Sequence, residues 1–192
     1  MRDDLGTGEG GVHAVAAAVL RFWLQETPPE KRFAQDDALD RVIAERFGAV
    51  RDAVLASDAA DWADDPRTLL AAIVLLDQFS RNMHRGTAEA FAGDPLARRL
   101  TQIALVRGWD EALSAIERQF LYIPLMHSED RHDQTTCLAM FEKLGNAEEL
   151  GYARAHAAVI ERFGRFPSRN AALGRRSTPQ ELTFLSQSGA GW

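Results

Sequence analysis

The chain is poor in cysteine and in signals for β-strands. Its single cysteine, Cys137, excludes an internal disulfide framework among the 192 residues and fits a reducing cytoplasm, where we expect the protein. The apolar neighbours Leu138 and Met140 predict that this thiol is buried and inert. The sequence has no sustained alternation of polar and apolar residues and no Asn-Gly turn, so strands joined by hairpins are not expected.

Long hydrophobic runs and an excess of positive charge are also missing. The longest apolar runs, 14–20 and 69–76, are far shorter than the ~20 residues that a membrane-spanning helix needs. A net charge of −6 argues against binding nucleic acid or an anionic membrane over the whole surface. Neither is therefore expected as a partner.

Helix start and stop signals, by contrast, are frequent. Residues 12–25 predict a first helix, which the Pro-Pro pair in 27–30 ends. Residues 36–47 place their apolar side chains on one face of a second helix. Gly48 interrupts this pattern, and 49–56 either continues the helix or restarts it.

A third helix is expected to be the centre of the fold. Asp65 followed by Pro66 is a strong helix start. The helix that it opens is apolar on all sides from Leu69 to Leu76, as in a helix buried all round, and Gly86 should end it.

The second half of the chain repeats these caps and glycine stops. Pro124 should kink or restart the helix that Asp110 begins, and Thr178 forms a capping box with Glu181. The predicted helices are 88–107, 110 to beyond 124, 129–144, 146–163, a turn at 167–174, and 178–186. Short loops between helices imply antiparallel neighbours. The fold predicted is all-α, with stacked antiparallel helical hairpins in a single domain over 12–187, a flexible tail at 1–11 and a C-terminal tail at 188–192.

A polar cluster lies where the central helix leaves the core. Asp77 and Arg81 are four residues apart, so they share a helix face and can pair. The other members are Gln78, Asn82 and Arg85. Basic residues in a last helical turn favour the helix dipole, which explains the arginines without a ligand. That explanation leaves the other polar groups of an apolar helix without partners, so something polar is expected opposite them.

A second cluster is unusually basic for an acidic chain. Residues 162–180 contain five arginines and no acidic residue. Arg169 and Asn170 follow a Pro-Ser pair at or just inside a helix N-terminus, where positive charge is disfavoured unless an anion is present. The anion could be a carboxylate of the chain, such as Asp77 or Glu129, or an external ligand. The sequence leaves both open.

Histidines supply the candidates for proton transfer. Glu129 and His132 have the spacing of half a di-iron motif, but there is no second copy, so no metal is expected. His156, among alanines, is ordinarily a satisfied core histidine. Because histidine titrates near neutral pH, His127 and His156 are nevertheless the best acid–base candidates, with Glu129 as a third. There is no Gly-rich phosphate loop and no serine-hydrolase motif, and no cofactor is expected.

Several of these stretches resemble a known bacterial family. The resemblance to the "domain of unknown function 924" proteins rests on VLRFWL (19–24), LLDQFSRNMHRGTAEAFAGDPLA (75–97), FLYIPLMHSED (120–130) and RFGRFPSRNAALGR (162–175), and so extends over nearly the whole chain. It implies a small all-helical protein with a tetratricopeptide-like arrangement of hairpins. The family has no established activity, so the resemblance implies no substrate.

Two functions from different classes remain. The first is a site for a small anionic ligand bearing phosphate or carboxylate, and the candidate binding residues are Asp77, Gln78, Arg81, Asn82, Arg85, His127, Glu129, Arg165, Arg169, Asn170 and Arg175. The alternative is a tetratricopeptide-like scaffold for a protein or peptide, in which the arginine network is purely structural. A ligand site predicts a solvent-reached pocket with more positive than negative charge. A structural network predicts paired arginines and no cavity. The sequence leaves open whether the protein is an enzyme.

Overall fold

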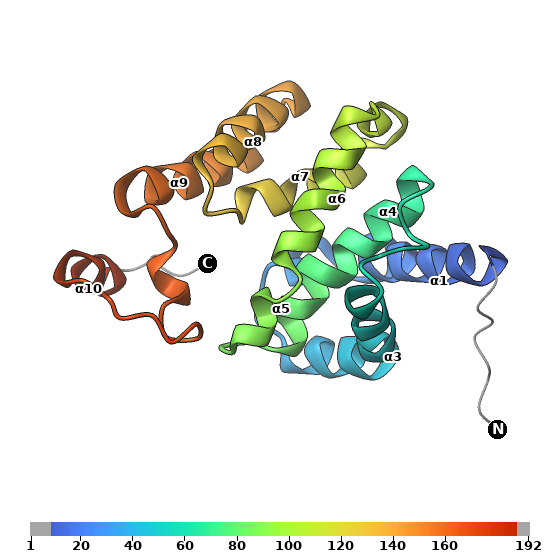
Figure 1. Ribbon diagram of the computed structural model, residues 1–192, viewed down its shortest axis with the longest axis horizontal. Helices are drawn as coiled ribbons and strands as arrows, with labels where there is room; N and C mark the ends of the chain where they lie inside the picture. The colour runs from blue at the N-terminus through green and yellow to red at the C-terminus, as the bar shows by residue number, and fades with distance from the viewer. Residues whose placement is uncertain (1–8, 188–192) are drawn as a thin grey trace.

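The computed structural model describes residues 9–187, and throughout this range the chain folds into helices joined by turns and loops (Figure 1). The all-α prediction is confirmed. The predicted C-terminal tail, 188–192, and the first eight residues of the predicted N-terminal tail lie outside the described residues. The first helix begins at Glu9, three residues before its predicted start.

The N-terminal quarter forms a helical layer around an aromatic cluster. Its elements are α1 (Glu9–Arg21), the π-helical turn η1 (Phe22–Glu26), α2 (Pro29–Arg32) and α3 (Asp37–Ala56). Helix α3 passes through Gly48 without a break, so the pattern continues rather than restarts. Buried Ile43, Phe47 and Val54 along this helix offset the roughly 1 kcal/mol that a mid-helix glycine costs.

The central helix is where the sequence predicts it. It consists of α4 (Pro66–Ile73), the π-helical segment η2 (Val74–Phe79) and α5 (Ser80–Met83). Asp65 caps it by accepting a hydrogen bond from the backbone N–H of Arg67 at 2.8 Å. The wider π-helical turn carries Asp77 and Gln78, both buried, into the interior. A polar pair therefore lies at the end of an otherwise apolar core helix.

The next segment differs from the prediction of one helix over 88–107. A 3₁₀ turn, η3 (Ala88–Phe91), comes first, and α6 (Asp94–Val106) begins only after Gly93. An added Cβ at Gly93 would lie 2.6 Å from the carbonyl oxygen of Leu76, so the chain crosses the central helix in close contact. The predicted start of this helix was wrong because a tertiary contact decides it.

Helix α7 also begins later than predicted. After the turn η4 (Trp109–Ala112), a capping box of Ser114 and Glu117 opens α7 (Ala115–Met126). Asp110 accepts a hydrogen bond from the Tyr122 hydroxyl at 2.8 Å instead of capping the helix. Pro124 lies in the last turn, and the helix continues through it to Met126 rather than restarting there.

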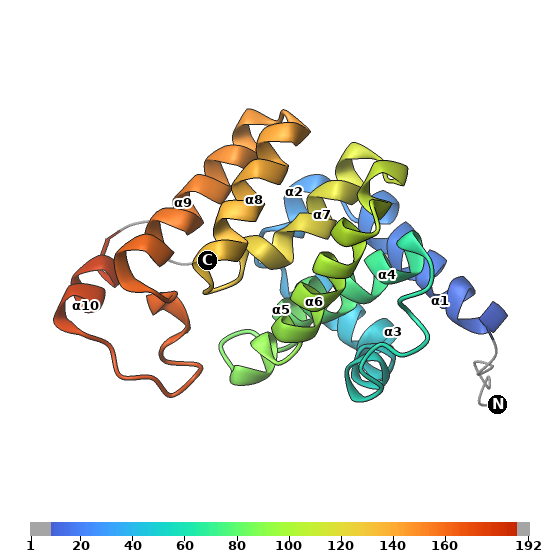
Figure 2. The same ribbon diagram turned by 45° about the horizontal axis from the view of Figure 1, so that its top comes forward.

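The C-terminal third packs beside this body as an antiparallel pair and a closing segment. Its elements are α8 (Arg131–Leu144), α9 (Ala147–Phe163), the turn η5 (Pro167–Arg169) and α10 (Pro179–Leu185). Gly145, with a φ of +78°, joins α8 to α9 as predicted, and the two helices lie side by side in both views (Figures 1 and 2). Cys137 of α8 is buried, as predicted, and burial raises its pKa to about 12.

Two further expectations concern membranes and metals. None of the helices over residues 9–187 is long and apolar enough to cross a membrane. Within the same range, no three His, Cys, Asp or Glu side chains gather in a way that could hold a metal ion.

Candidate functional site

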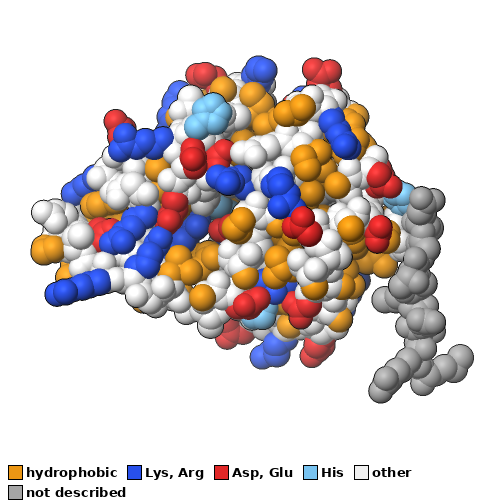
Figure 3. Space-filling view, viewed as in Figure 1, with side chains coloured by type: hydrophobic (Ala, Val, Ile, Leu, Met, Phe, Trp, Pro, Cys, Tyr) orange, Lys and Arg blue, Asp and Glu red, His pale blue; other side chains and the backbone are white. Residues whose placement is uncertain are grey.

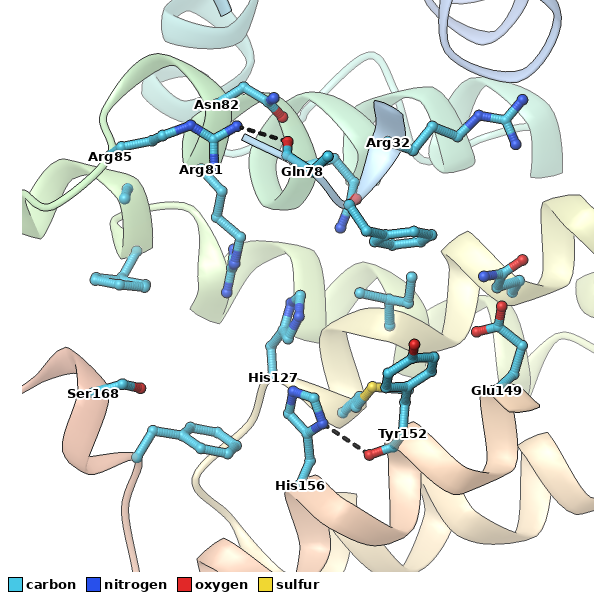
Figure 4. A pocket seen from close by; sticks show the side chains of 18 of the residues that line it. Arg32, Gln78, Arg81, Asn82, Arg85, His127, Glu149, Tyr152, His156 and Ser168 are labelled. Carbon is cyan, nitrogen blue, oxygen red and sulfur yellow. Dashed lines mark hydrogen bonds between the residues drawn. The ribbon is translucent and has the colours of Figure 1, made fainter. Parts of the chain in front are cut away.

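A pocket of about 1040 Å³ opens between the N-terminal helices and the C-terminal third. Its walls come from α2, the end of the central helix, η3, α7, α9 and the turn η5, so segments far apart in sequence meet around it (Figure 4). One wall is polar and another is apolar.

The structure divides the predicted site residues into three groups. Seven line the pocket: Gln78, Arg81, Asn82, Arg85, His127, His156 and Arg169. Asp77 is buried directly behind His127. The remaining four, Glu129, Arg165, Asn170 and Arg175, do not line the pocket and form a separate network in the C-terminal segment.

The Asp77 carboxylate joins the central helix to the end of α7. Its Oδ1 lies 2.7 Å from Nδ1 of His127 and 3.1 Å from Nη1 of Arg81, which confirms the predicted Asp77–Arg81 pairing. Gln78 donates to Oδ2 at 2.5 Å. Burial alone would raise the pKa of Asp77, but the charge of Arg81 and these donors outweigh it and hold the pKa well below its usual range. The carboxylate is therefore ionised.

Both pocket histidines are neutral at pH 7. Burial, with the nearby Arg81 charge second, lowers the pKa of His127 to about 4. Burial also lowers the pKa of His156 to about 4. An ionised carboxylate can only accept, so Nδ1 of His127 carries the hydrogen and donates to Asp77. By the same argument Nδ1 of His156 donates to the Tyr152 carbonyl at 2.8 Å (Figure 4).

Asp94, at the start of α6, binds two of the pocket arginines. Arg81 makes a two-pronged contact with it, at 2.8 and 2.9 Å, and Arg169 donates to its Oδ2 at 3.2 Å. Arg169 also donates to the carbonyl oxygen of His127 at 2.9 Å. Its guanidinium lies 4.9 Å from the ring centroid of Phe91 and 4.5 Å from that of Phe166. Burial, then repulsion from Arg81, lowers the pKa of Arg169 to about 10.

Asp40 of α3 plays the same part at the rim. Its carboxylate accepts from Asn82 at 2.7 Å and from Nε and Nη2 of Arg85 at 2.5 and 2.9 Å. The pairing holds Arg85 over the pocket mouth, where about a third of its side chain is exposed. Neither Asp40 nor Asp94 stands out in the sequence, since each lies in the first turn of its helix, where acidic residues are common.

The remaining arginines hold the C-terminal segment together. Glu129 accepts from Arg175 at 2.8 and 3.0 Å and from the backbone N–H of Phe166 at 2.8 Å. Arg165 makes a similar paired contact with Glu181, at 2.7 and 2.8 Å, and Asn170 reaches the same carboxylate at 3.4 Å. Basic side chains gather over this part of the molecule, on the left of Figure 3. Arg165 and Arg175 are therefore already paired with carboxylates of the chain.

The apolar wall was missed in the sequence. It comprises Phe33, Ile116, Ile123, Met126 and Tyr152. Two of its rings are exposed to an unusual degree, Phe33 by 64% and Tyr152 by 49%. Phe33 is stacked on Phe120, with 5.9 Å between ring centroids and 8° between planes. The Phe33 position follows a Pro-Pro pair, and the sequence indicates only a helix break there.

The two structural criteria for a ligand site give a mixed result. The arginines do converge on a pocket, yet each is already paired. The charged residues that line the pocket are four arginines and three glutamates: Arg32, Arg81, Arg85, Arg169, Glu30, Glu148 and Glu149. Positive charge therefore exceeds negative charge by only one. The pocket is therefore defined by directed donors more than by net charge.

The fold and this pocket define an all-helical, pocket-containing protein, and comparison places it in a family. The chain belongs to the family described as "Bacterial protein of unknown function (DUF924)", whose model matches residues 19–189. It is similar to the solved structure of the protein of unknown function ATU0120 from Agrobacterium tumefaciens. That similarity has a TM-score of 0.86 at 38% sequence identity, over 91% of this chain and 98% of that one. The curated proteins include no match to the chain.

Proposed function

We propose that the pocket binds a small organic anion, a carboxylate or phosphate ester attached to an apolar body. The observation that carries the proposal is the pocket of about 1040 Å³ with Arg81, Arg85 and Arg169 along its polar wall. A cavity of this volume encloses a ligand of drug-like size, and guanidinium groups are the side chains best suited to carboxylate and phosphate.

The paired arginines retain donors for a ligand. Arg85 uses Nε and Nη2 on Asp40, and its Nη1 has no hydrogen-bond partner among residues 9–187. Arg81 uses Nη1 and Nη2 on Asp94, and its Nε has no partner in the same range. Because carboxylates already hold these side chains in place, a ligand would lose little affinity to ordering them.

The exposed rings supply the apolar contact. Phe33 and Tyr152 line the same pocket as the arginines, and Tyr152 lies on the side away from Arg85 (Figure 4). Covering such rings stabilises a complex by roughly 25 cal/mol per Å² of apolar surface removed from water. A ligand with its charged group at Arg85 would place its body against them.

Acidic side chains that line the same pocket restrict the charge of that body. Glu30, Glu148 and Glu149 line the pocket, and none of them forms an ion pair with another residue of the described range. Burial, with the neighbouring Glu148 charge second, raises the pKa of Glu149. A second anionic group on the ligand would be repelled there, so we expect ligands with one charged end to bind better than linear dianions.

Thermal-shift measurements with matched pairs of compounds test the proposal. Phenyl phosphate and hexanoate should raise the Tm, in proportion to RT ln(1 + [L]/Kd), whereas phenol and hexanol should not. Arg85→Ala should remove the shift. The matched control is Arg162→Ala, whose guanidinium stacks on Phe163 outside the pocket. Equal shifts for charged and neutral partners, or none with any anion of a broad panel, would overturn the proposal.

A peptide-binding scaffold is the second candidate, and the exposure of Phe33 and Tyr152 favours it. A peptide could place a carboxylate on the arginines and an apolar side chain on these rings. Selection from a peptide library against the wild-type protein, with Phe33→Ala as the counter-selection, tests it. Binders that tolerate Phe33→Ala would exclude this pocket as their site.

A further inference from the structure

We propose that the Asp77–His127 pair makes this pocket a reaction site, in which Nε2 of His127 acts as the general base in the hydrolysis of an ester. This inference rests on the proposed function, because the substrate would be an ester whose anionic group is held by the pocket arginines. It goes further in assigning a reaction and a catalytic residue.

The geometry of the pair is that of an oriented base. Nδ1 of His127 donates to a carboxylate that is 1% exposed, at 2.7 Å, which sets both the ring orientation and the tautomer. The lone pair is therefore on Nε2. That nitrogen has no hydrogen-bond partner among residues 9–187, yet it is not sealed from solvent, and His127 lines the pocket (Figure 4). An oriented and unoccupied acceptor faces the space where a substrate would lie.

The surrounding charges act in both directions on proton transfer, because burial and the charges of Arg81 and Arg169 disfavour the imidazolium of His127 whereas Asp77 favours it. The charged and titratable groups near His127 come from four other elements: Asp77, Arg81, Asp94, His156 and Arg169. Arg81 and His127 share Oδ1 of Asp77, so a guanidinium lies next to the base. Negative charge that develops on a substrate oxygen beside His127 would be stabilised by this guanidinium. Asp77 would stabilise the imidazolium formed in the same step.

The step balances without any further reagent. Nε2 takes one proton from a water molecule while the water oxygen forms a bond to the acyl carbon. The carbon–oxygen bond to the alcohol then breaks, and the imidazolium returns the proton to the leaving oxygen. One ester and one water give one acid and one alcohol, and His127 ends as it began.

Hydrolysis of 3-carboxy-4-nitrophenyl butyrate tests the proposal with a chromogenic ester whose carboxylate the pocket arginines can hold. His127→Gln should lower the rate by about 100-fold or more, the usual range for losing a general base. Asp77→Asn preserves the side-chain shape but removes the ionised acceptor of the Nδ1 proton, and should also lower the rate. His132→Gln, an exposed histidine outside the pocket, is the matched control and should leave the rate unchanged. A wild-type rate no higher than that of His127→Gln would overturn the inference.

The pH profile separates this base from an ordinary imidazole, and it uses the unmutated protein. From about pH 7.5 down to pH 5.5, the neutral fraction of an ordinary histidine falls about tenfold. His127, with a pKa of about 4, should retain nearly all of it. We expect the rate to stay level over this range, while the reference rate with N-acetylhistidine falls about tenfold. A parallel fall in both would contradict the assignment.

Phenyl phosphate distinguishes failure of the inference from failure of the proposed function. If it inhibits hydrolysis competitively, both stand. If hydrolysis depends on His127 but phenyl phosphate neither inhibits nor binds, the anion-binding proposal fails and the base assignment remains. If phenyl phosphate raises the Tm through Arg85 while hydrolysis is absent, the pocket binds anions and the inference is wrong.

Discussion

Asp94 neutralises two guanidinium groups that would otherwise repel each other inside the pocket wall. Arg81 and Arg169 come from distant parts of the chain, and the charge of the first lowers the pKa of the second. Both donate to this carboxylate, so it couples the central helix to the turn η5. From the sequence, Asp77 or Glu129 is the expected carboxylate partner for Arg169 in the arginine-rich segment 162–180. In the structure its partner is Asp94.

Removing that carboxylate should therefore be costly. We expect Asp94→Ala to lower the free energy of unfolding by about 3 kcal/mol, because it leaves two partly buried guanidinium groups without their counter-charge. Asp58→Asn is the control, since it removes the charge that pairs with Arg99 at the surface, where such pairs contribute about 1 kcal/mol or less, and asparagine tolerates the left-handed backbone of this position. Urea denaturation measures both. Equal losses for the two variants would refute the role given to Asp94.

The two neutral histidines make a second prediction at this scale. Their folded pKa of about 4 lies below the ordinary value of 6.5, so between these values the unfolded chain binds more protons than the folded one. Stability is fully present above about pH 6.5 and is lost as the pH falls toward 4, by at most about 1.4 kcal/mol per pH unit for each histidine.

Urea denaturation over this pH range checks the prediction. In the double variant His127→Gln/His156→Gln the free energy of unfolding should depend on pH less steeply than in the wild type. Any pH dependence of the free energy of unfolding that both proteins share comes from the titration of carboxylates instead. An unchanged slope in the double variant would show that neither histidine is held neutral by the fold.

The central helix and the turn that crosses it show how one element decides the next. The π-helical segment Val74–Phe79 widens the helix where Asp77 turns into the pocket wall. Gly93 lies against the Leu76 carbonyl of that segment, directly before Asp94. The close approach therefore positions the carboxylate that both arginines use.

A pair of glycine substitutions tests this contact. Gly93→Ala should lower the free energy of unfolding by about 1–3 kcal/mol, because the new methyl group would clash with backbone atoms. Gly151→Ala, in α9 with open space around it, should instead raise it by up to about 1 kcal/mol through helix propensity. Thermal or urea unfolding gives both signs. A neutral Gly93→Ala would show that the crossing is looser than described.

Elements with strong local signals could be predicted from the sequence, and those set by tertiary contacts could not. Asp65-Pro66 opens the central helix, Gly145 separates α8 from α9, and Thr178 caps α10, because a cap acts within a few residues. The start of α6 depends on the contact of Gly93 with Leu76, seventeen residues earlier than Gly93, and no local pattern reports it. Likewise Ser114 rather than Asp110 caps α7, since Asp110 is engaged by Tyr122.

For the molecule as a whole, the sequence predicts that three distant segments meet. It does not predict which of their residues line the pocket and which form the separate C-terminal network. Asp77, His127 and Arg169 are brought together, as expected for polar groups in apolar surroundings. Arg165 and Arg175 belong to the same arginine-rich segment as Arg169, yet they pair with Glu181 and Glu129 away from the pocket. Arginine content alone cannot separate a pocket arginine from a structural one, because in both roles the guanidinium pairs with a carboxylate.

The network outside the pocket should control the order of the C-terminal segment. Losing the charge-assisted hydrogen bonds of Glu129 costs about 1.5 kcal/mol or more, so in Glu129→Ala we expect this segment to open about tenfold more often. Limited trypsin digestion, with cleavage followed at 165–176 by mass spectrometry, measures it. Glu142→Ala is the control, because its pairing with Arg154 spans 3.9 Å at the exposed surface. Equal cleavage in both variants would contradict the network's role.

The most direct test of the account is calorimetric titration of phenyl phosphate into the wild-type protein and into Arg85→Ala and Arg162→Ala. The account predicts a saturable heat with one site per chain in the wild type. In Arg85→Ala the affinity should be at least about tenfold weaker, because a charge-assisted hydrogen bond contributes about 1.5 kcal/mol or more. In Arg162→Ala the affinity should be unchanged. No binding to the wild type, or equal binding by all three proteins, would contradict it.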